Sequence, residues 1–166
     1  MRTLLALSAL LLAAEGPDGS RRAVVVAEAI EVLDGPDEAA FSTGRLQRGA
    51  RVNVLRIEPG GWVEIEPPEG AFDWIPRDAV EVVSGRSARV VTRRAVVRAG
   101  CEGARMPGAA RLSLRAGAIV HLIARPPLQL RRGGESQTWL AIQPPRGDAR
   151  FLRAEGIKMI GDEGPA

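Results

Sequence analysis

The chain has 166 residues, of which 45% are hydrophobic and 26% charged, the composition of a folded globular protein. It contains one Cys and one His, which excludes an intrachain disulfide and any metal site built from several Cys or His residues. The net charge is +3, and all but one of its 23 basic residues are Arg. No apolar run reaches the roughly 18 to 20 residues that a membrane-spanning helix needs.

The N-terminus has the features of an export signal over residues 1–14. Arg2 is followed by an uncharged, mostly apolar run from Thr3 to Ala14. That length suits the apolar part of a signal peptide and is too short to cross a membrane. We therefore expect an exported protein, periplasmic or extracellular, with an uncertain cleavage site and a linker over residues 15–21. The alternative is that this run forms a buried N-terminal helix.

An internal repeat accounts for most of the remaining chain. Residues 46–52 match residues 114–120 at an offset of 68, and residues 62–70 match residues 139–147 at an offset of 77. The longer match shares the pattern W-x-x-I-x-P-P-x-G, and the change of offset predicts an insertion at residues 124–137. The repeat predicts two tandem domains and their flanking segments: 22–83, a linker at 84–87, 88–161 and a tail at 162–166.

Each copy of the repeat consists of short, β-branched runs that partly alternate between apolar and polar residues, which predicts β-strands. Sequences rich in Pro and Gly, such as residues 67–70, separate these runs as turns. The expected strands are 23–27, 51–57, 62–66, 79–83, 88–92, 119–124, 139–142 and 156–160. We therefore expect an all-β fold. Short strands in small domains favour closed or half-closed barrels, because closure removes exposed strand edges.

Four motifs occur in the same order in both copies. The first copy has them as Val32-x-x-Gly35-Pro36, Leu46-x-x-Gly49-x-x-Val52, Gly61-Trp62-Val63-x-Ile65 and Trp74-Ile75. The second has them as Val97-Arg98-x-Gly100, Leu114-x-x-Gly117-x-x-Val120, Trp139-x-x-Ile142 and Phe151-Leu152. This order resembles the bacterial SH3-type (SH3b) domain over residues 22–161. The resemblance implies two tandem SH3-like β-barrels.

Domains of the SH3b family are typically exported, often tandem, and act as binding or targeting modules, frequently on the cell wall. The resemblance therefore implies a non-enzymatic module that recognises an envelope ligand, either peptidoglycan, an anionic polymer or a peptide. Ala79 stands where eukaryotic SH3 domains carry a groove tyrosine. Ordinary polyproline recognition is for this reason not expected.

Three tryptophans, Trp62, Trp74 and Trp139, are candidate ligand-binding residues. Alternation along the strand places Trp62 on the same face as Glu64 and Glu66, which is the wetter face. A tryptophan ring on such a face can stack on a sugar ring or on a proline of a peptide. The alternative is that these rings close the end of a barrel or form a satellite core against Trp74.

Charge is unevenly divided between the two expected domains. Residues 22–83 carry a net charge of −6 and residues 84–161 carry +11. The basic domain can bind an anionic polymer, with Arg131 and Arg132 of the insertion as candidate contacts. Opposite charges can also attract the two domains to each other, within one chain or between chains. An interaction adaptor built on that pairing is therefore the second functional hypothesis, whereas the export signal and the acidic domain disfavour nucleic-acid binding.

The sequence carries no motif that indicates catalysis, a metal site or a cofactor, so we expect a protein that is not an enzyme. His121 shares a strand face with Ile119 and Ile123 and is expected to be partly buried. Cys101 lies in a turn, and nothing around it or His121 resembles a cysteine hydrolase. An intermolecular disulfide through Cys101 remains an alternative for an exported chain.

Overall fold

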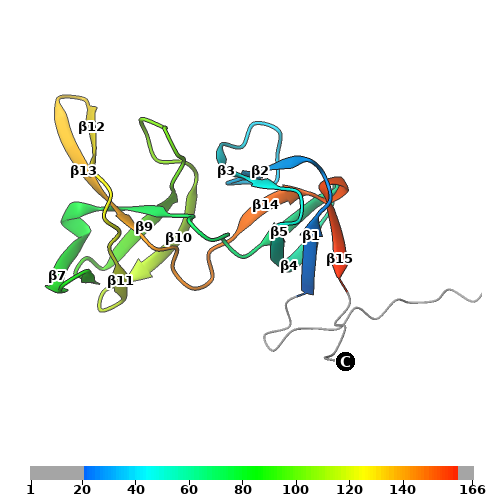
Figure 1. Ribbon diagram of the computed structural model, residues 1–166. Coiled ribbons are helices and arrows are strands. Elements are labelled where there is room, and N and C mark those ends of the chain that lie inside the picture. Colours follow the sequence, from blue (N-terminus) through cyan, green and yellow to red (C-terminus); the bar gives the residue numbers. More distant parts are fainter. Residues whose placement is uncertain (1–20, 161–166) are drawn as a thin grey trace, which may run out of the picture.

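The computed structural model describes residues 21–160, which form an all-β protein (Figure 1). The expected signal peptide, most of its linker and the tail lie outside these residues. The strands are β1 Arg21–Val25, β2 Ala29–Leu33, β3 Ser42–Gln47, β4 Arg51–Glu58, β5 Trp62–Ile65, β6 Asp73–Pro76, β7 Val80–Ser84, β8 Ser87–Val90, β9 Arg94–Ala99, β10 Ala110–Arg115, β11 Ile119–His121, β12 Leu128–Arg132, β13 Glu135–Ile142, β14 Arg150–Arg153 and β15 Ile157–Ile160. Two short 3-10 helices, η1 (Arg77–Ala79) and η2 (Ala154–Gly156), precede β7 and β15. Within the described residues no helix is long and apolar enough to cross a membrane.

The strands divide between two lobes that lie side by side (Figure 1). Lobe 1 contains a seven-stranded sheet in the order β15-β1-β4-β5-β14-β2-β3. Lobe 2 contains a five-stranded sheet, β10-β9-β6-β13-β12, and a three-stranded sheet, β11-β8-β7. Each lobe has its own apolar core, with Ile65 and Leu152 fully buried in lobe 1 and Ile75 and Ile142 in lobe 2. The all-β class is thus confirmed, but none of these sheets is closed.

The lobes do not follow the two copies of the repeat. Strands β14 and β15 come from the second copy but lie in lobe 1, where Leu152 is the cross-strand partner of Val63. Strands β6 and β7 come from the first copy but lie in lobe 2, where Ile75 is the partner of Leu140. Lobe 2 is therefore one continuous segment, residues 73–142, inserted into lobe 1.

This pairing differs from the contiguous domains 22–83 and 88–161 that the repeat predicts. Residues 84–87, expected to link the domains, instead form the turn of a hairpin between β7 and β8 inside lobe 2. Residues 124–137, expected as an insertion, contribute β12 and the start of β13, and this hairpin projects from lobe 2 (Figure 1).

Two connections, each of seven residues, link the lobes. Residues 66–72 run from lobe 1 to lobe 2, and residues 143–149 return from lobe 2 to lobe 1. Each contains two consecutive prolines and ends its turn on a glycine with positive φ, Gly70 at 84° and Gly147 at 87°. Proline fixes φ and favours an extended residue before it, so a Pro-Pro pair resists folding back into a tight hairpin. The connection therefore delivers the next strand to the other lobe, as in domain swapping.

A buried ion pair holds the two crossing points together. Asp73 and Arg150 occupy equivalent positions of the repeat, 77 residues apart, and both are fully buried. The Nη2 atom of Arg150 donates to Asp73 Oδ1 at 2.6 Å and to the carbonyl oxygen of Phe72 at 3.2 Å. The two copies of the repeat carry opposite charges at this equivalent position and therefore attract each other there. Two copies with the same charged residue at this position would repel each other.

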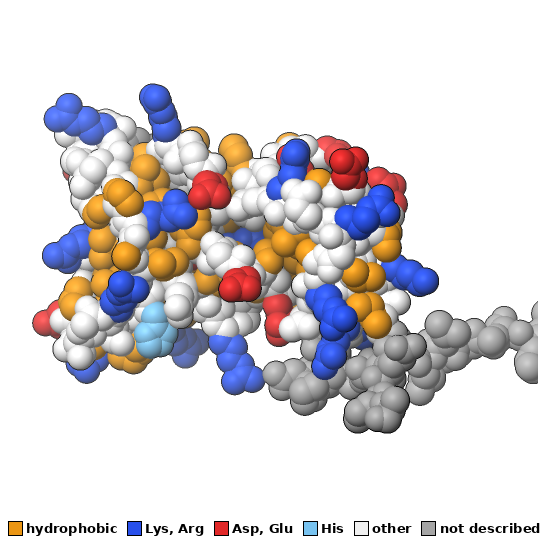
Figure 2. All heavy atoms as spheres, viewed as in Figure 1, with side chains coloured by type: hydrophobic (Ala, Val, Ile, Leu, Met, Phe, Trp, Pro, Cys, Tyr) orange, Lys and Arg blue, Asp and Glu red, His pale blue; other side chains and the backbone are white. Residues whose placement is uncertain are grey.

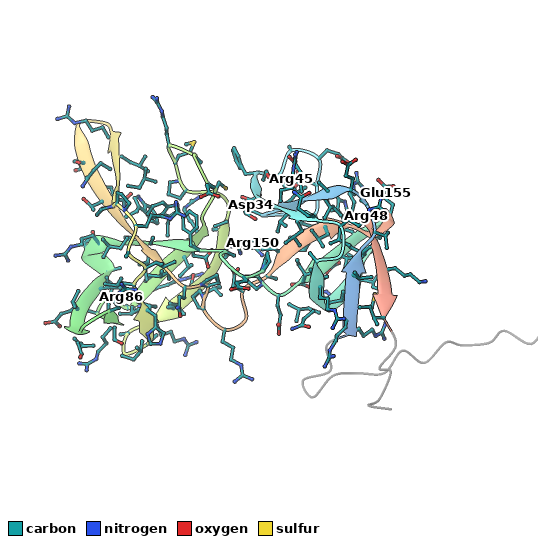
Figure 3. The ribbon with its side chains drawn as sticks, in the orientation of Figure 1. Asp34, Arg45, Arg48, Arg86, Arg150 and Glu155 are labelled. Atoms are coloured by element: carbon teal, nitrogen blue, oxygen red, sulfur yellow. The ribbon has the colours of Figure 1, made fainter. Side chains whose placement is uncertain are left out.

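Further contacts extend this cluster from one lobe into the other. Asp148 accepts hydrogen bonds from Arg150 and, at 3.1 Å, from Nε of Arg111, which lies in lobe 2. Arg111 also donates to the backbone carbonyl of Asp34 in lobe 1. The Asp34 carboxylate in turn accepts from the backbone N–H of Ala109 at 2.6 Å, and Asp34 and Arg150 both lie at the junction of the lobes (Figure 3).

The exchange of strands also changes how charge is distributed. Lobe 1, residues 21–65 and 150–160, contains nine Lys and Arg against eight Asp and Glu. Lobe 2, residues 73–142, contains 12 Arg against five Asp and Glu, a net charge of +7. Figure 2 shows Lys and Arg side chains on both lobes. The lobes therefore do not carry the opposite net charges of residues 22–83 and 84–161, and the adaptor hypothesis based on that contrast stays a prediction.

Candidate ligand groove

The five-stranded sheet of lobe 2 has one face against the core and one outer face. Strand β9 shows this division through its alternating burial, since Ala95 and Val97 belong to the main core whereas Arg94 and Arg98 are more exposed. Trp74 and Trp139, on β6 and β13, belong to a separate apolar cluster instead of the main core. The outer face of lobe 2 therefore carries aromatic rings at its centre and arginines on one side.

A groove of about 740 Å³ runs over this outer face. Trp139 and Pro76, which are cross-strand partners, line it together with Leu130 of the β12–β13 hairpin. Met106 and Pro107, from the loop between β9 and β10, also line it. The groove thus combines an apolar surface from two strands with side chains from a hairpin and a loop.

The groove is strongly basic. Arg94, Arg98 and Arg131 line it, against a single acidic residue, Asp78. The Nη1 atom of Arg98 donates to the carbonyl oxygen of Gly108 at 3.0 Å, which ties the β9–β10 loop to the sheet. Ala79, which stands where eukaryotic SH3 domains carry a groove tyrosine, also lines the groove. An apolar surface flanked by arginines suits an extended ligand that carries negative groups.

Trp74 and Trp139 are core residues that also shape this groove. Their exposed fractions are 5% and 6%, so neither ring is an open stacking platform. Trp74 packs edge-to-face on Phe72, with ring centroids 5.3 Å apart. Trp139 therefore packs with Trp74 in a small apolar cluster apart from the main core, as the alternative to a ligand-binding role predicted. The indole Nε1 atoms of both residues are buried without a hydrogen-bond partner in the described part of the chain.

Trp62 occupies the equivalent position in lobe 1 and is also buried, with 6% of its surface exposed. The Arg153 guanidinium lies over its ring, 4.0 Å from the centroid, and donates to the carbonyl oxygen of Gly60 at 3.3 Å. Arg153 also forms an ion pair with Glu38. Because Arg153 stands where lobe 2 has Pro76, the surface of lobe 1 that corresponds to the groove is covered by this side chain. The prediction that Trp62 lies on a wet face is wrong.

The structure brings together two of the five candidate residues at the groove surface, Trp139 and Arg131. Trp74 packs beneath them in the same cluster as Trp139, whereas Trp62 lies in the other lobe. Arg132 ends β12, where its backbone is opposite Glu135. Arg94 and Arg98 were missed, although the alternation of residues 94–99 would have revealed them as one face of a strand.

His121 and Cys101 do not lie among the residues that line the groove. His121 is exposed beside the exposed Ile119, so the prediction of a partly buried histidine is wrong. Burial, together with the negative charge of Asp34, raises the pKa of the Cys101 thiol to about 11 against the opposing effect of Arg150. A thiol with this pKa is protonated at neutral pH and is a poor nucleophile. Within residues 21–160 no group of His, Cys, Asp and Glu side chains is arranged to hold a metal ion.

The chain matches no protein-family model, no curated protein and no solved structure. The resemblance to the SH3b family therefore depends on the repeated motifs alone.

Proposed function

We propose that the protein is an exported, non-enzymatic binding module with two SH3-like units, and that its lobe-2 groove holds a negatively charged chain of the cell envelope. The observation that carries the proposal is the groove itself, in which Trp139 and Pro76 lie between arginines. The resemblance to the SH3b family supports the SH3-like units, and the apolar run at residues 1–14 supports export.

Internal strand symmetry is consistent with two SH3-like units. Each lobe contains the same succession, a strand, a 3-10 turn and a second strand: β6-η1-β7 at the start of lobe 2 and β14-η2-β15 at the end of lobe 1. In each lobe the first of these strands pairs with the strand of the W-x-x-I motif. Each unit thus contains the full set of repeated motifs, although the chain supplies them from both copies.

The apolar part of the groove gives the ligand a surface to cover. Met106 is 57% exposed, and Leu130 is partly buried beside Trp139. Covering such side chains gains about 25 cal/mol for each Å² of apolar surface removed from water.

The two lobes have different roles in this proposal. Arg153 covers Trp62 in lobe 1, whereas the corresponding Pro76 leaves Trp139 at the groove surface in lobe 2. We therefore expect one ligand site in each chain, with lobe 1 acting as the scaffold. Binding measured with a soluble ligand should have a stoichiometry of one, and a value of two would assign a site to lobe 1 as well.

Co-sedimentation with purified cell-wall sacculi at low and high salt tests the proposal. We expect pelleting at low salt that weakens at high salt, because arginine contacts to a charged polymer are screened. The Arg131→Ala variant should pellet several-fold less than the wild type. The matched control is Arg86→Ala, an exposed arginine at the β7–β8 turn on the opposite side of lobe 2 (Figure 3). Absence of pelleting at both salt concentrations, or equal losses in the two variants, would refute the proposal.

A further inference from the structure

We propose that lobe 2 carries a phosphate subsite beside the groove, formed by Arg93, Arg94 and Arg115 with Ser113. The inference rests on the proposed function and deepens it, because it identifies the negatively charged chain as one that carries phosphate groups. The three arginines and the serine line a hollow of about 640 Å³ on the outer face of the sheet.

Two of these arginines face each other across adjacent strands. Arg94 on β9 is the direct cross-strand partner of Arg115 on β10, and both side chains are exposed. Residues in this relation have Cβ atoms about 5 Å apart, and like charges there destabilise the strand pair. Arg94 is held in place, since its Nε donates to Ser113 Oγ at 2.9 Å. The structure thus positions two positive charges where they repel each other.

Among the described side chains, no carboxylate forms an ion pair with Arg93, Arg94 or Arg115. The ion pairs between described side chains use six other arginines: Arg45, Arg56, Arg111, Arg125, Arg150 and Arg153. A comparable exposed strand arginine, Arg89 on β8, is in register with Glu81 instead. Arg89 thus faces an acidic residue across the strands, whereas Arg94 faces another arginine, so an external anion would relieve the repulsion within the Arg94–Arg115 pair.

The donors in the hollow fit a phosphate better than a carboxylate. Arg94 keeps both terminal nitrogens for a ligand, and its bond to Ser113 uses the hydroxyl as an acceptor, which leaves the hydroxyl hydrogen to donate. Arg93 and Arg115 add two more guanidinium forks. Several guanidinium forks in one hollow can together match the oxygens of a tetrahedral phosphate, whereas one fork already satisfies a carboxylate.

Arg94 lines both the phosphate hollow and the ligand groove. The Arg94 and Arg115 side chains are exposed, so the hollow is accessible to solvent. A chain that lies over Trp139 and continues past Arg94 therefore reaches the hollow with its next charged group. This continuity favours a phosphodiester polymer over free phosphate as the source of the anion.

Calorimetric titration of the protein with poly(glycerol phosphate) and, separately, with inorganic phosphate tests the inference. We expect the polymer to bind, Arg94→Ala and Arg115→Ala each to weaken its binding about tenfold, and each to reduce the slope of log affinity against log salt by about one. Arg89→Ala should leave affinity and slope at the wild-type values. Binding of inorganic phosphate without binding of the polymer would overturn the assignment of a polymer.

A thermal melt separates loss of binding from loss of folding. Removing Arg115 relieves repulsion, so Arg115→Ala should unfold at the wild-type temperature or above it without polymer. Polymer should raise the unfolding temperature of the wild type more than that of the variant. If Arg94→Ala and Arg115→Ala bind polymer as the wild type does, the subsite is refuted, whereas the proposed function stands if sacculi still pellet and Arg131→Ala still weakens pelleting. Failure of the wild type to bind either sacculi or polymer would refute both.

Discussion

Replacing Asp73 by Asn tests whether the ionic cluster at the lobe junction holds a proton near neutral pH. The cluster contains three carboxylates, Asp34, Asp73 and Asp148, and two guanidinium groups, Arg111 and Arg150. It is therefore one unit negative when all groups are ionised. Burial raises the pKa of Asp73 from 3.8 to about 7, and this effect exceeds the opposing attraction of Arg150. A proton on Asp73 makes the cluster neutral.

The sign of the pH effect follows from this shift. Between about pH 4 and pH 7 the folded protein binds the Asp73 proton and the unfolded chain does not, so the free energy of unfolding falls as the pH rises. Each pH unit in that interval contributes at most about 1.4 kcal/mol, or about 4 kcal/mol in total. Asp73→Asn keeps an oxygen acceptor for Arg150 without the charge. The variant should lose this pH dependence and be at least as stable as the wild type at about pH 8.

Urea unfolding followed by tryptophan fluorescence, repeated between about pH 5 and pH 8, measures the effect. The control is Asp148→Asn, because Asp148 accepts hydrogen bonds from both Arg111 and Arg150. Neutralising it leaves two guanidinium groups poorly paired, and we expect a loss of about 3 to 5 kcal/mol. A wild type that gains stability as the pH rises, or an Asp73→Asn variant with the wild-type slope, would refute the proton assignment.

Three other expectations concern the architecture. A fragment of residues 72–143 should unfold cooperatively in a thermal melt followed by circular dichroism, whereas a fragment of residues 22–83 should not; the reverse result would restore the contiguous domains. Trp62→Ala should cost about 3 to 5 kcal/mol in urea unfolding because its ring is buried, and a smaller loss than about 1 kcal/mol would contradict that burial. Gly100→Ala should be strongly destabilising, since its Cβ would lie 2.3 Å from the Phe72 ring, whereas Gly44→Ala has no atom within 4 Å and should melt like the wild type.

The strand content could be predicted from the sequence, because β-branched alternating runs are a local signal. Residues 51–57 were expected as a strand and β4 spans Arg51–Glu58. The pairing of the strands could not be predicted, since β5 can pair with either β6 or β14, which carry equivalent motifs. In the structure a Pro-Pro connection precedes each exchanged strand, and Arg150 of β14 donates to Asp73 of β6, a contact whose partners are 77 residues apart in sequence.

The candidate site could be predicted only in part. Trp139 and Arg131 were named from local patterns and do line the groove. The burial of Trp62 depends on Arg153, which comes from the other copy of the repeat, so no pattern within one copy reveals it. The role proposed for Arg94 depends on its cross-strand partner Arg115, and the two arginines become neighbours only when β9 pairs with β10.

The insertion of lobe 2 into lobe 1 sets the order in which the protein can be completed during synthesis. Strands β1 to β5 are made first, and β1 and β5 can each pair with β4, but their second partners, β15 and β14, are missing until residues 150–160 have been made. Lobe 2 needs only residues 73–142 and can finish folding before then. The earliest part of the chain is thus the last to be stabilised, and until then its exposed strand edges are open to aggregation.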